Sequence, residues 1–111
     1  IKVLDLTLPL GSVRHHSPNE GMHKPHYRKK QAKFGMLSGF PDIEIFVQRH
    51  WFHDDVRWAP IFIELKSEKG RLSDNQKVVL QKLDEAGCHT MVCRSVLEVQ
   101  DFLNGLIKLR C

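Results

Sequence analysis

Two charged residues, Glu64 and Lys66, stand inside the stretch PIFIELKSEKG (residues 60–70), which otherwise has the pattern of a buried strand. Residues two apart on a strand leave the same face, so these two side chains should point the same way. Charged residues are rarely buried unless something pairs with them. Asp42 begins another strand-like segment, directly after the tight GFP turn. If the two strands pair through the loop 49–58, Asp42 and Glu64 can converge at one end of a sheet.

Such a pair of carboxylates suits metal-assisted chemistry. Two carboxylates at one point repel each other, and a divalent cation removes that cost. Mg²⁺ favours oxygen ligands and typically takes one or two carboxylates while keeping waters. A nearby lysine suits an attacking water or a transferring phosphate. Asp42 followed by Glu-x-Lys on adjacent strands therefore indicates phosphodiester hydrolysis, whereas the plainer alternative is an ordinary Glu64–Lys66 ion pair across the pleat or on a solvated edge strand.

The order of the expected strands and helices predicts an α/β fold, with a mixed central sheet flanked by helices. These elements must position Asp42, Glu64 and Lys66. Strands are expected at 13–16, 42–49, 59–67 and 88–94, helices at 25–36, 73–87 and 95–109, and partly extended chain at 4–10. Ser73 is a good N-cap for the middle helix, and Gly87 sits just past its last turn. The predicted apolar stripes of the last two helices are Val79, Leu80, Leu83 and Ala86, then Val96, Val99, Phe102, Leu103 and Leu106.

Composition narrows the class of protein. The 111 residues are 41% hydrophobic and 27% charged, which suits one core and predicts a single domain over 1–111. The apolar runs are too short for a transmembrane helix, and the opening IKVLDLTLPLG is too punctuated for a secretory signal. Three cysteines without a C-x-x-C pair favour a reducing, intracellular location. The net charge of +4 gathers in KPHYRKKQAK (24–33), which fits a polyanionic partner as well as it fits a solvated helix face.

The order and spacing of four segments are informative about the protein family. These segments are HHSPNEG (15–21), GMLSGFPD (35–42), FIELKSEKGRLSDNQ (62–76) and AGCHTMVCRSVLEVQDFL (86–103). With these spacings the chain resembles the virus-type replication-repair nuclease domain (VRR-Nuc) of the PD-(D/E)XK nuclease superfamily. The resemblance covers nearly the whole chain, which looks like the minimal, single-domain form found in phages and bacteria. It implies a PD-(D/E)XK, restriction-endonuclease-like core.

The same resemblance implies a set of catalytic residues, which are Glu20, Asp42, Glu64, Lys66 and Gln76. Asp42 and Glu64 would bind Mg²⁺ or Mn²⁺, helped by the backbone carbonyl of Leu65. Glu20, in PNEG, would complete the site and could join the metal ligands. Lys66 would orient or activate the attacking water.

Two of these residues also have plainer explanations. Gln76 is three residues after Ser73, which is the S-x-x-Q spacing of a capping box. It also shares the helical face turned to the sheet, so its amide could reach the site instead of the helix end. Glu20 could simply start a turn with Asn19 and Gly21.

The remaining polar and aromatic residues have supporting roles. Basic residues are expected along the nucleic-acid backbone, giving affinity without sequence reading, and these are Arg28, Lys29, Lys30, Lys33, Lys69 and Arg71. The seven histidines show no zinc-finger or H-E-x-x-H spacing, so we expect most to be surface or packing residues. For Trp51 and Trp58 we favour packing under the hairpin or a dimer surface over contact with DNA.

By the resemblance, we expect a metal-dependent, structure-specific endonuclease for branched DNA such as four-way junctions, flaps or forks. Minimal members of the family look like junction-cleaving homodimers, and the expected compartment is the cytoplasm of a bacterium or a phage-infected host. The main rival is a DNA-binding module of the same fold that has lost catalysis. A second rival is a small non-enzymatic phage interaction protein, which would need neither metal nor paired carboxylates.

Overall fold

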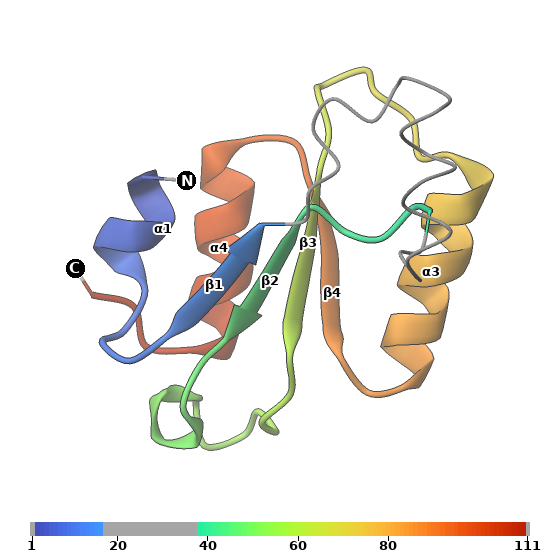
Figure 1. Ribbon diagram of the computed structural model, residues 1–111. Helices are drawn as coiled ribbons and strands as arrows, with labels where there is room; N and C mark the ends of the chain where they lie inside the picture. The colour runs from blue at the N-terminus through green and yellow to red at the C-terminus, as the bar shows by residue number, and fades with distance from the viewer. Residues whose placement is uncertain (1, 17–37, 111) are drawn as a thin grey trace.

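The computed structural model describes residues 2–16 and 38–110, which build a four-stranded sheet with helices around it (Figure 1). The strands are β1 (Val13–His16), β2 (Ile43–Phe46), β3 (Ile61–Leu65) and β4 (His89–Cys93), in that spatial order. The helices are α1 (Lys2–Thr7), α3 (Asp74–Glu85) and α4 (Val96–Leu106), with the short 3-10 helix η1 (Arg49–Trp51) between β2 and β3. The first three strands pair antiparallel, and β3 pairs parallel with β4. The predicted α/β class, a mixed sheet with flanking helices, is confirmed.

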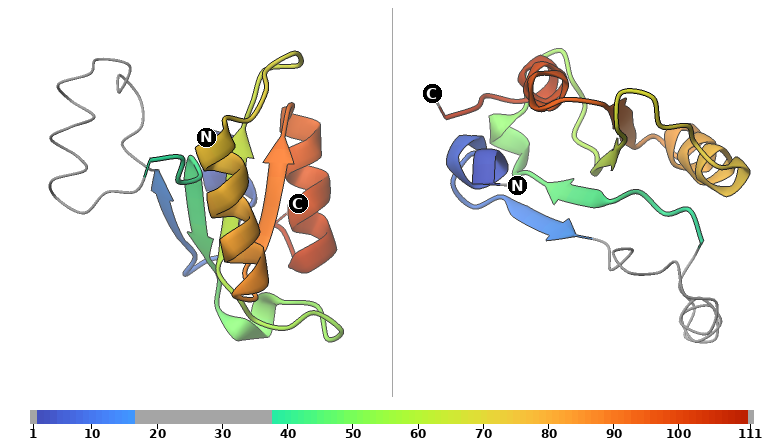
Figure 2. Two further views of the ribbon diagram at one scale, coloured as in Figure 1. Left: turned by 90° about the vertical axis from the view of Figure 1, so that its right-hand side faces the viewer. Right: turned by 90° about the horizontal axis from the view of Figure 1, so that it is seen from above.

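The helix α3 is the crossover that a parallel pair of strands requires. Antiparallel strands can be joined by a short loop, but β3 and β4 run the same way and need a longer connection. The predicted ends of this helix are confirmed: Ser73 is the N-cap, and Gly87 lies just past the end with φ +97°. From above, α1 and α4 lie together while α3 lies apart from them (Figure 2).

The hydrophobic core fills the face of the sheet that is covered by α1 and α4. Alternate residues of the hairpin point into it, and Ile45, Ile61 and Ile63 are fully buried. The helices α1 and α4, with the residues that directly follow them, contribute Leu4, Leu8, Val99, Leu103 and Ile107. Each such side chain contributes about 1.5–3 kcal/mol of burial free energy. The opposite face of β3 carries Phe62 and Glu64, so this strand is buried on both sides and its charge faces away from the apolar core.

The predicted extended segment at 4–10 is wrong, because Lys2–Thr7 is helical. Leu4 and Leu8 are buried in the core, whereas Leu6 and Leu10 are 73% and 70% exposed. Leu4 and Leu8 are four residues apart, a spacing that fits both a strand face and a helix face. Packing on the sheet selects the helix, because the intervening Leu6 then points to solvent.

The predicted apolar stripes of α3 and α4 are correct in part. Val79, Leu80 and Leu83 are half-buried, but Ala86 is exposed at the end of α3. In α4, Val99 and Leu103 are buried and their stripe neighbours Phe102 and Leu106 half-buried, whereas Val96 is 57% exposed. Both exceptions lie at the end of a helix, Ala86 after the last turn of α3 and Val96 in the first turn of α4. There the helix extends past the surface that the rest of the protein covers. The helix expected at 25–36 lies outside the described residues.

The other expectations drawn from composition concern membranes and thiols. None of the helices in the described parts of the chain is long and apolar enough to cross a bilayer. Cys93 is buried in the core, and this burial and, second, the charge of Glu98 raise the pKa of its thiol to about 11. Cys88 and Cys93 are both free thiols. Cys93 thus behaves as a small hydrophobe.

Candidate active site

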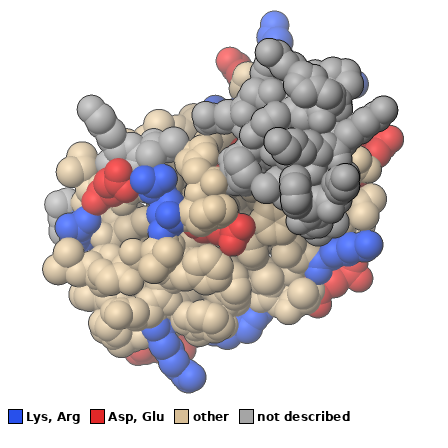
Figure 3. Space-filling view, viewed as in Figure 1, with Lys and Arg blue, Asp and Glu red and all other residues tan. Residues whose placement is uncertain are grey.

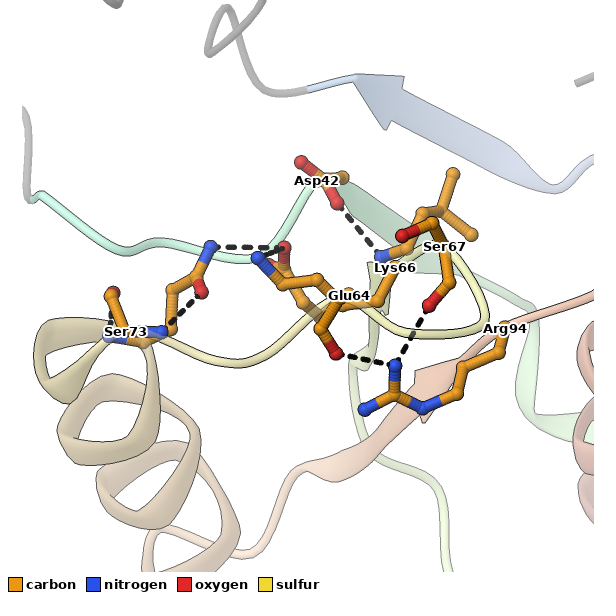
Figure 4. A network of polar contacts seen from close by, with 9 residues as sticks. Asp42, Glu64, Lys66, Ser67, Ser73 and Arg94 are labelled. Atoms are coloured by element: carbon orange, nitrogen blue, oxygen red, sulfur yellow. Dashed lines mark hydrogen bonds and ion pairs between the residues drawn. The ribbon is translucent and has the colours of Figure 1, made fainter.

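Asp42 and Glu64 lie at the same end of the sheet, where β2 begins and β3 ends. The hairpin pairs Ile43 with Ile63, so Asp42 and Glu64 occupy the next opposed position. The Asp42 Oδ2 atom accepts a hydrogen bond from the backbone N–H of Leu65 at 2.8 Å (Figure 4). This bond fixes the Asp42 carboxylate against the strand that carries Glu64.

Glu64 is a deeply buried carboxylate, only 2% exposed. Its Oε2 atom accepts a hydrogen bond from Gln76 Nε2 at 3.1 Å and lies 4.0 Å from Lys66 Nζ. Its Oε1 atom is buried and has no hydrogen-bond partner among the described residues. A buried polar atom without a partner costs free energy, so this oxygen is available to a ligand that supplies positive charge or a proton.

The electrostatics of the pair favour such a ligand. Burial and, second, the charge of Asp42 raise the pKa of Glu64 from 4.5 to about 8, while the ammonium of Lys66 acts in the opposite direction. Two carboxylates that share a site cannot both ionise cheaply, so without a cation Glu64 holds a proton at neutral pH. A divalent ion would replace that proton and remove the repulsion.

Gln76 serves the helix end and the site at the same time. The side-chain Oε1 atom of Gln76 accepts a hydrogen bond from the backbone N–H of Ser73 at 2.8 Å. The backbone N–H of Gln76 donates to Ser73 Oγ at 3.1 Å. This is the complete capping box. The amide has an acceptor end and a donor end, so its Nε2 remains free to donate to Glu64. The sequence presented the cap and the inward contact as alternatives, whereas one side chain makes both.

The turn before Asp42 is pressed against the start of α3. Gly39 has φ +84°, and a Cβ atom there would lie 2.7 Å from the backbone C of Asn75 and from the N of Gln76. Ser38 Oγ accepts a hydrogen bond from Asn75 Nδ2 at 3.2 Å. The turn that delivers Asp42 and the helix that delivers Gln76 are therefore in direct contact, and glycine is needed at position 39 for both its φ and its size.

Arg94 is a polar residue of this region that the sequence reasoning missed. It follows β4 directly, and its Nη1 atom donates to the carbonyl oxygens of Ser67 at 2.8 Å and Gly70 at 2.6 Å (Figure 4). The local signal was an arginine between a strand end and Ser95, the N-cap of α4. That signal does not identify the distant carbonyls that the guanidinium reaches.

Several predicted site residues lie outside the described residues, namely Glu20, Arg28, Lys29, Lys30 and Lys33. Lys69 and Arg71 are exposed on the segment that follows β3. On the described part of the face shown in Figure 3, basic side chains are interspersed with acidic ones and do not gather into one patch. Lys69 and Arg71 thus lie on the surface of the segment between β3 and α3, and the described part of the face in Figure 3 shows no continuous basic track.

His15, Trp51 and Trp58 have contacts that give each of them a structural role. His15 Nδ1 lies 3.6 Å from Glu44 Oε1, its opposite residue across the β1–β2 pair. Within the part of the chain that is described, no group of three or more His, Cys, Asp or Glu residues is arranged to hold a metal. Trp51 packs against the core, and Trp58 Nε1 donates to the carbonyl of Val47 at 2.8 Å. Both tryptophans therefore support the hairpin.

The residues present nevertheless fit a hard divalent cation. Asp42, Glu64 and the Leu65 carbonyl are oxygen donors from adjacent strands, and Mg²⁺ commonly takes one or two carboxylates with waters completing its shell. Glu64 Oε1 is buried without a hydrogen-bond partner among the described residues, and burial beside Asp42 raises the pKa of this carboxyl, so a cation here would be stabilised by both carboxylates. No soft thiolate or imidazole set competes for the position among these donors.

Comparisons with known proteins bear on the fold and on the family of the chain. A search of curated proteins found no match. A solved structure described as a VRR_NUC domain protein superposes with a TM-score of 0.57 at 22% identity, over 82% of this chain and 64% of that one. The present chain thus spans about two thirds of the length of that structure, and the likeness shows a shared fold. A sequence model of the VRR-NUC domain matches residues 14–97, most of the chain. This protein belongs to the VRR-NUC family of nuclease domains.

Proposed function

We propose that the protein is a metal-dependent endonuclease that hydrolyses phosphodiester bonds in DNA. The observation that carries this proposal is the buried Glu64, which is held by Gln76, opposed by Asp42 and flanked by Lys66 at one end of the sheet. A purely structural ion pair would not require a second carboxylate beside Glu64. Membership of a family of nuclease domains supports a nucleic acid as the substrate, and we take DNA as that substrate.

Mg²⁺ or Mn²⁺ would be held by Asp42, Glu64 and the Leu65 carbonyl, and Glu20 could join them. Such an ion, when bound, supplies a water of lowered pKa and neutralises charge on the phosphate. Gln76 keeps the Glu64 carboxylate oriented toward the site by holding its Oε2 atom. Asp42 is oriented by the Leu65 N–H in the same way.

Lys66 would supply a positive charge beside the reacting phosphate. Its ammonium lies on the same side of the strand as Glu64, 4.0 Å from Oε2. From there it can orient an attacking water or stabilise negative charge that develops on the phosphate oxygens. Exposed Lys69 and Arg71 would contact the sugar–phosphate backbone and give salt-dependent, sequence-independent affinity.

Branched DNA is the preferred substrate in this proposal, and a homodimer is the working form. The support is the resemblance to minimal VRR-Nuc domains, which look like junction-cleaving homodimers. Two sites on one symmetric dimer would suit two cuts in a four-way junction. The oligomeric state is measured by light scattering during size-exclusion chromatography, and a monomer at the concentration that cleaves junctions would contradict this part.

The test is cleavage of labelled junction, flap, fork and linear duplex DNA, with Mg²⁺, with Mn²⁺ and with EDTA. Lys66→Ala is expected to lower the single-turnover rate by roughly 10²- to 10⁴-fold, and Asp42→Asn to abolish metal-dependent cutting. Lys108→Ala removes an exposed lysine that follows the far end of α4 and should cut like the parent. Absence of cleavage with either metal, or parental rates for Lys66→Ala, would refute the proposal. Binding without cleavage would favour a DNA-binding module instead.

A further inference from the structure

The guanidinium of Arg94 connects the end of β4 to the turn that follows the Glu-x-Lys strand. A single nitrogen, Nη1, donates to two carbonyl oxygens of that turn, at Ser67 and Gly70. The same two residues close the turn, because Gly70 N–H donates to Ser67 O at 3.1 Å. The Arg94 side chain therefore holds both ends of one turn.

The base of Arg94 is itself held in place. Its backbone N–H donates to Glu98 Oε1 at 2.9 Å, and Ser95 Oγ accepts from Glu98 N–H at 3.1 Å. These bonds tie the residue to the first turn of α4, which is packed on the core through Val99. The guanidinium thus reaches the turn from a fixed position on the scaffold.

The turn in question carries the side chain of Lys66. Lys66 N–H donates to Cys93 O at 3.0 Å, which is the last bond of the parallel ladder before the chain leaves the sheet. Beyond it the chain folds back, so that a Cβ atom placed on Gly70 would lie 3.5 Å from Cδ of Lys66 and 2.9 Å from Ser67 Oγ. The aliphatic stem of Lys66 therefore borders the space beside Gly70 that a side chain would fill, and the carbonyl of Gly70 accepts the hydrogen bond from Arg94.

We propose that Arg94 is a positioning residue: it fixes the Ser67–Gly70 turn and, through Gly70, the place of the Lys66 ammonium beside Glu64. This inference rests on the proposed nuclease function for its catalytic consequence. The bonds that Arg94 makes are solvent-exposed, so they add little to stability. Their effect is geometric, because an ammonium on a flexible stem acts only where the stem is held.

A matched control is available in Arg57. Its Nη2 atom donates to the carbonyl of Gly87 at 2.6 Å, which is also an exposed bond from an arginine to a turn, but at the other end of β4. Arg57→Ala and Arg94→Ala each remove one guanidinium and one positive charge. A difference between the two variants therefore reports the position of the arginine.

The experiment combines hydrogen exchange with steady-state kinetics on the full chain. In Arg94→Ala, the amides of Lys66 and Gly70 should exchange faster while the remaining sheet amides keep parental rates. The rate constant kcat should fall roughly 10- to 100-fold with little change in KM, and guanidinium ion at sub-denaturing concentration should restore part of it. Arg94→Lys should show an intermediate kcat, and Arg57→Ala should behave like the parent in both measurements.

Three outcomes would overturn the inference. Parental exchange at Lys66 and Gly70 in Arg94→Ala would show that the turn does not need the guanidinium, whether or not the protein cleaves DNA. A raised KM with unchanged kcat would make Arg94 a DNA contact. An equal loss of kcat in Arg57→Ala would make the effect one of charge. If the parent cleaves no DNA, the proposed function fails separately, and the exchange measurement still decides whether Arg94 positions the turn.

Discussion

Replacing Glu64 by glutamine should make the metal-free protein more stable in alkaline solution. Burial and the nearby Asp42 raise the pKa of Glu64 from 4.5 to about 8 in the folded state. Between these two values the folded protein holds a proton that the unfolded chain has released. The folded state binds more protons, so the free energy of unfolding falls as pH rises through this window and levels off above about pH 8.

The magnitude follows from the width of the window. One pH unit corresponds to about 1.4 kcal/mol for one proton, so the destabilisation reaches about 4–5 kcal/mol at pH 8 and above. That is a large part of the stability of an ordinary domain, about 5–15 kcal/mol. Glutamine at position 64 carries no charge at any pH and still offers Gln76 Nε2 an acceptor oxygen. Glu64→Gln should therefore match the parent near pH 5 and exceed it by several kcal/mol at pH 8.

The assay is urea unfolding from pH 5 to pH 9 in EDTA, followed by tryptophan fluorescence. Glu85→Gln removes an exposed carboxylate on α3 and should leave the pH slope of the parent unchanged. Asp42→Asn should narrow the pH window and lessen the total loss of stability without abolishing it, because burial is the larger cause of the raised pKa. A difference between Glu64→Gln and the parent that stays constant from pH 5 to pH 8 would refute the reasoning.

Three further predictions concern the surroundings of Glu64, and a fourth concerns α4. Mg²⁺ in excess should raise the Tm of the parent in thermal scans, and EDTA should reverse the rise. The rise should grow with pH, because Glu64 must release its proton before the ion binds. Asp42→Asn should respond far less in the same scans. Gln76→Glu can still cap α3 but places a second carboxylate against Glu64, so circular dichroism should show the helix while stability at pH 8 falls by about 1–3 kcal/mol. Gly39→Ala forces a methyl group into the start of α3 at positive φ and should cost about 1–3 kcal/mol in urea unfolding. Gly105→Ala, in α4 with nothing near the added methyl, should instead gain about 0.5–1 kcal/mol.

Much of the fold could be predicted from the sequence, because its elements depend on local signals. Ser73 and Gly87 mark the ends of α3 through capping and a positive φ, which involve only neighbouring residues. The alternation around Ile61 and Ile63 marks β3 because one of its faces lies on the core. The opposition of Asp42 and Glu64 also followed once the two strands were paired, since the side-chain period of a strand is two.

The local signals failed where two structures satisfy the same pattern. Leu4 and Leu8 fit a strand or a helix, and their packing on the sheet decided for α1. Val96 fits the apolar stripe of α4, yet it is exposed because it lies at the start of the helix. In both cases the deciding quantity is which surface the rest of the molecule covers, and that is absent from a window of neighbouring residues.

By itself the sequence determined the helix caps, the strand faces and the choice of Asp42, Glu64 and Lys66 as the residues of the proposed chemistry. Only the tertiary structure decided how that chemistry is held in place. Gln76 caps its helix and reaches Glu64 with the same amide because α3 docks beside β3. Arg94 reaches a turn more than twenty residues earlier in the chain. These contacts depend on the relative placement of elements that packing brings together, and no local spacing encodes the distance between them.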